Sequence, residues 1–276
     1  MILSFAPVQT LGAAPLVVAL VAMLAYGVAA WSVQGLARLS VPALVAGWLL
    51  HALLLALDIG GWGRGEPGAR LGFGPVLSLT VWLVLAVHEV ESRFVPLPGV
   101  RRLLALSGAV VVLVAWAFPG EVRPMMSPLA PVHWLLGVAS YALFGAAVLH
   151  ATMLDAAERK LRGRAAGAAA PAPGPIGLPL LRLERLTFRF VEIGFAVLTL
   201  AVVLGLATAP HWRWDHKTVF SLLGWAVIAA LLIGRQWQGW RGRRATRWLY
   251  VGAALLLLAY AGSRFVFEVL LSRATP

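Results

Sequence analysis

Residues 190–233 read FVEIGFAVLTLAVVLGLAT (Phe190–Thr208), APHWRWDHKT (Ala209–Thr218) and VFSLLGWAVIAALLI (Val219–Ile233). Two long apolar runs therefore enclose a short segment that is polar and aromatic. An apolar run of about 20 residues is long enough to cross the hydrocarbon core of a bilayer as a helix. The stretch predicts two membrane-spanning helices joined by a Trp-rich loop at one membrane surface.

The rest of the chain follows the same pattern. Of its 276 residues, 61% are hydrophobic and 12% are charged, whereas soluble domains have about a quarter charged residues. The apolar runs are about Leu11–Trp31, Val41–Leu57, Phe73–Val87, Leu103–Phe118, Val132–Leu154, Phe190–Thr208, Val219–Ile233 and Trp248–Val269. We therefore expect an all-α, polytopic integral membrane bundle of about eight transmembrane helices, forming a single domain over residues 1–276.

The distribution of positive charge predicts the orientation of this bundle. An outer N-terminus places sixteen of the 23 lysines and arginines in cytoplasmic loops and leaves seven on the other side. Because cytoplasmic loops are enriched in Lys and Arg, we expect both termini outside (N-out, C-out) in a bacterial cytoplasmic (inner) membrane. Residues 156–186, which are first charged and then rich in Ala, Gly and Pro, are typical of a flexible cytoplasmic linker. The Trp-rich loop then lies on the extracytoplasmic face.

Composition also excludes several kinds of chemistry. The chain has no cysteine, so it has no thiolate metal site and no thiol for redox exchange or covalent haem attachment. Its net charge of +12 would suggest nucleic acid as a partner of a soluble protein. In a membrane protein, basic inner loops instead fix the topology and contact anionic lipid, so we expect no nucleic acid.

The Trp-rich loop combines two residue types that suit a porphyrin. Imidazole is the commonest protein ligand of haem iron, and an indole face stacks on a flat ring. The other interpretation is an ordinary interfacial loop, since Trp is enriched at bilayer surfaces. His133, at the outer end of the fifth run, can meet His211 and His216 at the same face. His150 is seventeen residues further along, about 25 Å away on a helix.

Two segments resemble a known family. Trp212-x-Trp214-Asp215-x-Lys217, followed by a run to Trp225, resembles the Trp-rich signature of the cytochrome c assembly family of haem-handling membrane proteins (CcsA/CcmC type). His133-Trp134-Leu135 through Ser140-Tyr141 resembles the external histidine and Ser-Tyr pair of that family. The resemblance is closest to the YpjD/HemX-like subgroup and most specific over residues 129–270.

The resemblance implies non-covalent binding of haem b on the outer face, and presentation of that haem in cytochrome c assembly. It implies haem, the lipid bilayer, and apocytochrome c or other maturation proteins as partners. It does not imply catalysis by this chain alone, which would at most be a component of a haem-ligation system.

The sequence departs from the family pattern at two positions. His216 stands where the family often has Pro, and Ala261-Gly262-Ser263-Arg264-Phe265 lacks the second external histidine of the last helix. His216 or His211 could instead supply the axial nitrogen opposite His133, and we favour His216 because it adjoins the seventh run. The expected contributions of the other residues are Trp212 and Trp214 against the ring, Arg213, Lys217 or Arg264 at the haem propionates, and Asp215 as a helix cap or as the partner of a histidine.

Two alternatives remain open. The first is a secondary transporter without haem, in which His51, Glu192 and an Arg264–Glu268 pair line a path through the membrane. A neutral His51 bonded to a neighbouring helix would equally explain that residue. The second is a membrane regulator of haem biosynthesis, which the sequence does not distinguish from a role in assembly.

Overall fold

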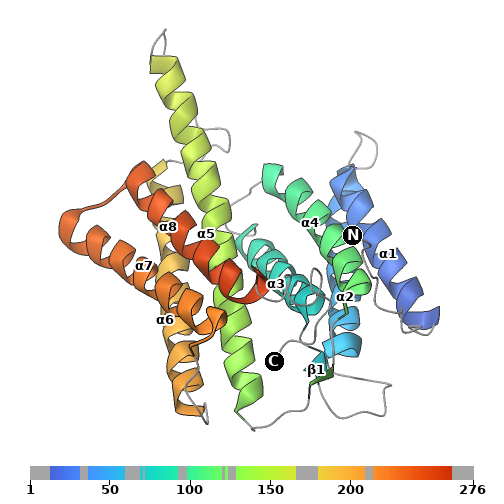
Figure 1. Cartoon of the computed structure of the whole chain (residues 1–276). Helices are drawn as coiled ribbons and strands as arrows, with labels where there is room; N and C mark the ends of the chain where they lie inside the picture. Colours follow the sequence, from blue (N-terminus) through green and yellow to red (C-terminus); the bar gives the residue numbers. More distant parts are fainter. Residues whose placement is uncertain are drawn as a thin grey trace, which may run out of the picture. The chain divides into compact units, whose positions relative to one another are not determined.

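The computed structural model describes residues 13–31, 37–59, 69–70, 72–92, 98–119, 122–123, 129–165, 180–208 and 214–262 (Figure 1). The α-helices in this part of the chain are α1 (Ala13–Ala30), α2 (Ser40–Ile59), α3 (Phe73–Ser92), α4 (Pro98–Ala117), α5 (Ala130–Ala165), α6 (Leu180–Thr208), α7 (His216–Gln238) and α8 (Gly242–Leu257). A 3₁₀ turn, Ala37–Leu39, precedes α2, and a π-helical turn, Leu258–Gly262, continues α8. The two-residue strands β1 (Ala69–Arg70) and β2 (Val122–Arg123) pair in antiparallel register.

These helices confirm the expected polytopic helical membrane bundle. Each of the eight apolar runs overlaps one helix, and among the described residues six helices are long and apolar enough to cross a bilayer. The apolar part of α1, Pro15–Ala30, is shorter, and α8 gains length from the π-helical turn. The N-out, C-out orientation stays a prediction.

Close contacts divide the chain into two units: residues 1–128 with 261–276, and residues 129–260. The first unit contains α1 to α4, and the second contains α5 to α8. The expectation of a single domain over residues 1–276 stays a prediction.

A buried polar chain holds the first unit together. The His51 side chain on α2 lies between Tyr26 on α1, at 3.1 Å from Nδ1 to Oη, and Ser78 on α3, at 2.7 Å from Nε2 to Oγ. All three side chains are buried. Gly47 and Gly108 line the Tyr26 ring, where an added Cβ would lie 3.0 and 2.8 Å from ring carbons. The structure confirms that His51 forms hydrogen bonds to neighbouring helices, as a buried imidazole should.

Two tryptophans join α2 to α3 in the same unit. Trp48 and Trp82 stack with ring centroids 4.7 Å apart and 5° between their planes. Each indole N–H donates to the backbone carbonyl of the other residue, at 3.2 and 3.0 Å. The pair therefore satisfies both indole donors without water, which suits helices that face lipid.

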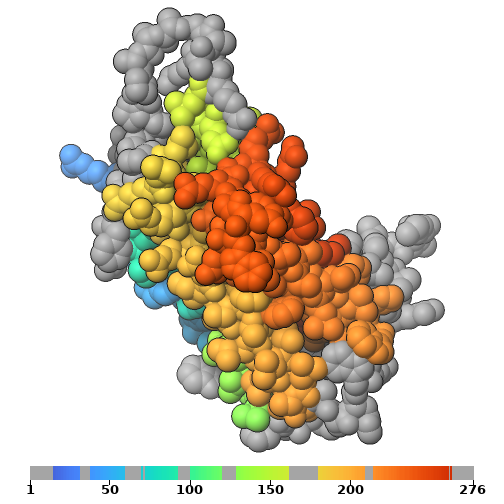
Figure 2. All heavy atoms as spheres, turned by 90° about the vertical axis from the view of Figure 1, so that its left-hand side faces the viewer, coloured from blue at the N-terminus to red at the C-terminus, as the bar shows by residue number. Residues whose placement is uncertain are grey.

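The second unit is built on α5 and α6, which run antiparallel along each other. His133 near the start of α5 contacts Ala201 near the end of α6, and Phe144 in the middle of α5 contacts Gly194 in the middle of α6. The close approach of α7 to α8 depends on Gly252, because Ile228 occupies the space of a Cβ there. Figure 2 shows one face of this unit, in which α6, α7 and α8 lie side by side.

The ends of α5 and α6 reach beyond their apolar runs. α5 continues through charged residues to Ala165, and α6 begins at Leu180. Ala, Leu, Glu, Lys and Arg are strong helix formers, so these polar turns stay helical beyond the expected membrane boundary. The expected linker, residues 156–186, thus overlaps both helix ends, and its central part, residues 166–179, lies outside the described residues.

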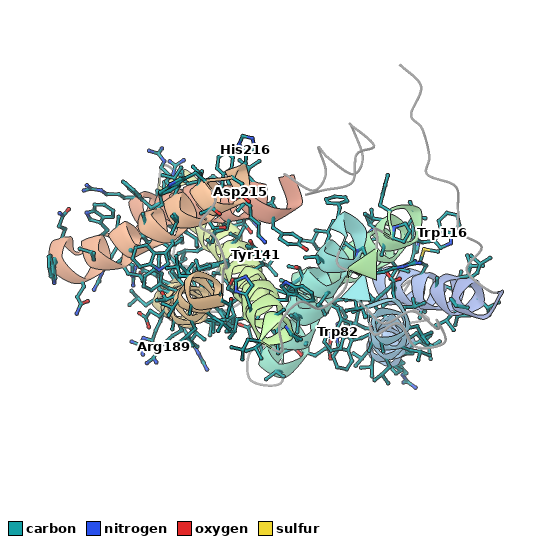
Figure 3. All side chains as sticks on the ribbon, turned by 60° about the horizontal axis from the view of Figure 1, so that its bottom comes forward. Trp82, Trp116, Tyr141, Arg189, Asp215 and His216 are labelled. Carbon is teal, nitrogen blue, oxygen red and sulfur yellow. The ribbon has the colours of Figure 1, made fainter. Side chains whose placement is uncertain are left out.

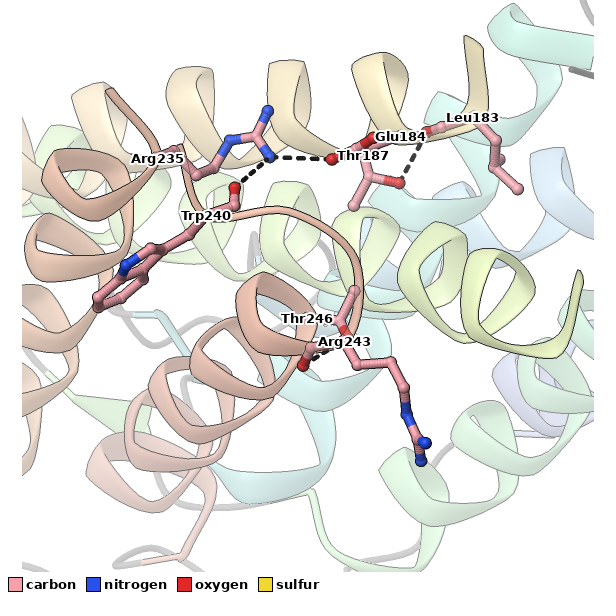
Figure 4. A network of polar contacts seen from close by, with 7 residues as sticks. All are labelled: Leu183, Glu184, Thr187, Arg235, Trp240, Arg243 and Thr246. Atoms are coloured by element: carbon pink, nitrogen blue, oxygen red, sulfur yellow. Dashed lines mark hydrogen bonds and ion pairs between the residues drawn. The ribbon is translucent and has the colours of Figure 1, made fainter. Parts of the chain in front are cut away.

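Partly buried ionic and polar contacts stabilise the end of the second unit that holds the start of α6. Arg235 on α7 lies 3.3 Å from Glu184 on α6 (Figure 4). Its guanidinium lies 3.4 Å from the centroid of the Phe188 ring. Asp155 on α5 accepts hydrogen bonds from the hydroxyls of Thr246 and Tyr250 on α8, at 3.0 and 2.9 Å. These contacts join α6 to α7 and α5 to α8 at one end of the unit.

Candidate functional site

Four helix ends meet at the opposite end of the second unit: the starts of α5 and α7, and the ends of α6 and α8 together with its π-helical turn. Lys217, in the first turn of α7, places its Nζ 5.6 Å from the centroid of the Tyr260 ring. The Tyr260 ring lies 6.3 Å from that of Tyr141 on α5. Lys217 is also close enough to His133 for its charge to act on the imidazole. Lys217 is therefore near both the Tyr260 ring and the His133 imidazole.

The His133 imidazole has a fixed direction. Its Nδ1 lies 3.0 Å from the carbonyl oxygen of Ala201 on α6. A carbonyl oxygen only accepts, so Nδ1 carries the proton and the neutral ring keeps a lone pair on Nε2. The ring lies against α6 at Gly205, where an added Cβ would be 2.9 Å from Cε1 and 3.4 Å from Nδ1. The backbone of α6 thus sets both the tautomer and the position of this side chain.

The described part of the Trp-rich loop lies at the start of α7. Asp215 is the N-cap of that helix, and its Oδ1 accepts a hydrogen bond of 2.8 Å from the backbone N–H of Thr218. The structure confirms the interpretation of Asp215 as a helix cap. His216 is the first residue of α7 and has an exposed side chain, and Figure 3 shows it beside Asp215. Trp214 is 72% exposed.

The other expected site residues are outside the part of the chain that the structure describes. His211, Trp212 and Arg213 lie outside the described residues, and so do Arg264 and Glu268. The choice between His211 and His216 as second ligand therefore stays a prediction, as do the propionate contacts of Arg213 and Arg264.

The sequence interpretation missed three residues of this site: Ala201, Gly205 and Tyr260. Ala201 and Gly205 are four positions apart on one face of α6, and such pairs of small residues let helices in membranes approach closely. That spacing could have indicated that a side chain of another helix lies there. Tyr260 had no local signal, because its role depends on the position of Lys217.

The other described histidines have different surroundings. His51 belongs to the polar chain of the first unit, where His88 is also buried. His150 is buried on α5, where its Nδ1 donates to the carbonyl of Ala146 at 2.7 Å and its ring stacks on Phe190 with centroids 5.3 Å apart. In the part of the chain that the structure describes, no three His, Asp or Glu side chains gather as ligands of a bare metal ion.

Comparisons with known proteins identify the family. A family profile described as "Cytochrome C assembly protein" matches residues 71–271. Inner membrane protein YpjD of Escherichia coli (strain K12) is 30% identical over 269 residues, which cover 92% of this chain and 99% of YpjD. Cytochrome c biogenesis protein CcsA of Synechococcus sp. (strain CC9902) is 27% identical over 289 aligned residues, which cover 94% of this chain and 93% of CcsA.

No solved structure matches the chain. One further relative matches over a shorter segment. Cytochrome c biogenesis protein CcsA of Synechococcus sp. (strain JA-3-3Ab) is 32% identical over 107 residues, 35% of this chain and 31% of that protein. The family match covers well over half of the chain, and its helices are apolar enough to span a bilayer. The chain is therefore a multi-pass protein of the cytoplasmic membrane that belongs to the cytochrome c assembly protein family.

Proposed function

We propose that this protein binds haem b without a covalent bond at the extracytoplasmic face of the membrane and presents it for cytochrome c assembly. The observation that carries the proposal is the tautomer of His133. Its proton is held on Nδ1 by the Ala201 carbonyl, which leaves Nε2 free of a proton. Histidines that bind metals usually have the second nitrogen oriented in this way by a carbonyl or a carboxylate.

The second axial ligand in this proposal is His216, and His211 is the alternative. His216 is exposed at the first position of α7, and its neighbour Lys217 is near His133. The Asp215 cap fixes the backbone of this turn, so the direction of the His216 side chain is limited to its own rotamers. A bis-histidine site at this end of the unit would hold haem iron without any thiol.

The same end of the unit offers groups that suit the rest of the haem. An ammonium at Lys217 can form charge-assisted hydrogen bonds with a propionate, and Arg213 and Arg264 are further candidates. Trp214 presents an exposed indole, and with Trp212 it would pack against the porphyrin. The protein then acts as a carrier, and covalent attachment of haem to apocytochrome c belongs to the assembly system as a whole.

The transporter alternative has less support. Glu192 has an exposed side chain on α6, so it does not line a path inside the second unit, and His51 has a partner at each ring nitrogen. Regulation of haem biosynthesis would use the same haem site. Loss of covalent cytochrome c in a deletion strain with normal haem precursors would favour assembly, and altered precursors with normal cytochrome c would favour regulation.

An absorption spectrum of the detergent-purified protein tests the proposal. We expect the wild type, after addition of haemin, to show a Soret band that weakens strongly in His133→Ala and in His216→Ala. His150→Ala is the matched control, because it removes an imidazole from the same helix about 25 Å away. A weaker band in His211→Ala but not in His216→Ala would show that His211, and not His216, is the second ligand. A wild type that retains no haem after free haemin has been removed by gel filtration would overturn the haem proposal.

A further inference from the structure

The turn between α7 and α8 carries a rigid aromatic platform. α7 ends at Gln238, and Gly239 (φ 64°) and Gly242 (φ 53°) adopt left-handed conformations that reverse the chain. The Trp240 indole folds back on α7 at Gly234, where an added Cβ would lie 2.5 Å from the ring. Its Nε1 donates to the side chain of Gln238 at 2.7 Å. The Trp240 ring therefore has a fixed position at the membrane end of α7.

Positive charge is concentrated around the Trp240 ring and the start of α8. The Arg244 guanidinium lies 4.3 Å from the centroid of the Trp240 ring. The exposed cations of the turn and of the first turns of α8 are Arg241, Arg243, Arg244 and Arg247. Within the described residues no salt bridge joins any of these four to a carboxylate, and residues 216–267 contain no Asp or Glu.

Three carboxylates lie near the turn, and one of them, Glu158 on α5, is at Gly242, where an added Cβ would be 3.1 Å from its Oε1. Glu184 binds Arg235, and Asp155 accepts hydrogen bonds from Thr246 and Tyr250. Glu184 and Asp155 are therefore engaged elsewhere, and the four exposed arginines outnumber Glu158, so the turn keeps a net positive charge. In Figure 2 the orange-red atoms of this region face the viewer.

An apolar surface continues directly from the charge. Arg244, Trp248 and Val251 follow one another at helical spacing on α8, and Trp248 is 36% and Val251 52% exposed. The rings of Trp240 and Trp248 lie 5.3 Å apart. On α7, Ile233 is 50% exposed. A ligand at this face would thus meet arginines at one end and lipid-facing hydrocarbon at the other.

We propose that the turn between α7 and α8 is a binding site for an anionic phospholipid, with the phosphate at Arg241 and Arg244 and an acyl chain along Trp248 and Val251. Guanidinium groups bind phosphate oxygens in a bidentate manner, and Trp rings lie preferentially at the level of lipid head groups. A soluble anion would use the charge but not the exposed apolar surface, and this is why we assign the site to a lipid. The proposal is independent of haem.

Native mass spectrometry of the full-length protein, purified in a mild detergent with added phosphatidylglycerol or phosphatidylcholine, tests the site. We expect phosphatidylglycerol to bind more tightly than phosphatidylcholine. Each cation near an anionic lipid surface changes binding by about fivefold, so the double variant Arg241→Gln/Arg244→Gln should weaken phosphatidylglycerol binding by roughly 25-fold. Both side chains are exposed, so the fold should persist, which a circular dichroism melt checks.

The double variant Arg182→Gln/Arg185→Gln is the matched control, because it removes two exposed cations from the start of α6 at the same end of the unit. Its phosphatidylglycerol affinity should stay close to that of the wild type. Equal losses in both double variants would show diffuse attraction and overturn the site, and so would equal affinity for the two lipids. Displacement of the lipid by millimolar inorganic phosphate would make the turn an anion site and overturn its assignment to lipid.

Discussion

Replacement of Gly205 by Ala is the most direct test of how α6 positions His133. The added Cβ would lie 2.9 Å from Cε1 of the imidazole, whereas ordinary contacts begin at 3.4 Å, so the ring must move by about 0.5 Å or more. The hydrogen bond from Nδ1 to the Ala201 carbonyl, now 3.0 Å, would then lengthen beyond the usual range of about 2.7–3.2 Å. Loss of such an orienting partner typically lowers the affinity for a metal by about 10- to 100-fold.

Haemin titration of the detergent-purified variant, followed at the Soret band, measures this effect. We expect the dissociation constant to rise by about 10- to 100-fold. Ala is a better helix former than Gly by about 1 kcal/mol, so weaker α6 helicity cannot explain a loss. Gly137→Ala on α5 is the control, because an added Cβ there meets nothing within 4 Å. If Gly205→Ala bound haemin as tightly as Gly137→Ala, the positioning of His133 by α6 would be refuted.

Two further predictions concern stability in detergent, measured by thermal unfolding. His51→Ala removes the hydrogen bonds to Tyr26 and Ser78 and leaves a cavity, so the melting temperature should fall by several degrees. The affinity for haemin should stay unchanged. A lower affinity for haemin would place His51 in the haem site. Tyr250→Phe removes one of two hydrogen bonds to Asp155 and should lower the free energy of unfolding by about 1 kcal/mol, and an unchanged melting temperature would argue against this bond.

Helix number and membrane class could be predicted from the sequence because hydropathy over some twenty residues depends only on the local chain. The helix ends could not. α5 continues to Ala165 and α6 begins at Leu180, because charged helix formers extend a helix into water where hydropathy alone indicates a boundary. The π-helical turn Leu258–Gly262 likewise left no signal in the apolar pattern.

The candidate site could be predicted only in part, for a related reason. His133, Asp215 and Lys217 carry their chemistry in their own side chains, so the sequence indicates them. Ala201 contributes a backbone carbonyl and Gly205 contributes the absence of a side chain. Neither contribution is visible before α5 and α6 are packed together, because the contacting residues are 68 positions apart.

The second unit keeps its two kinds of polar site at opposite ends of the same helices. His133 and His150 are seventeen residues apart on α5, about 25 Å on a helix, which is close to the roughly 30 Å thickness of the hydrocarbon core. The end with His133 carries an imidazole and the ammonium of Lys217, to which the proposed function assigns a ligand, whereas at the other end Arg235 and Asp155 bond within the unit. Under the proposed function, the end with His133 is the one that binds and releases haem. The bonded end would keep α6 joined to α7 and α5 joined to α8 while haem enters and leaves at the other end.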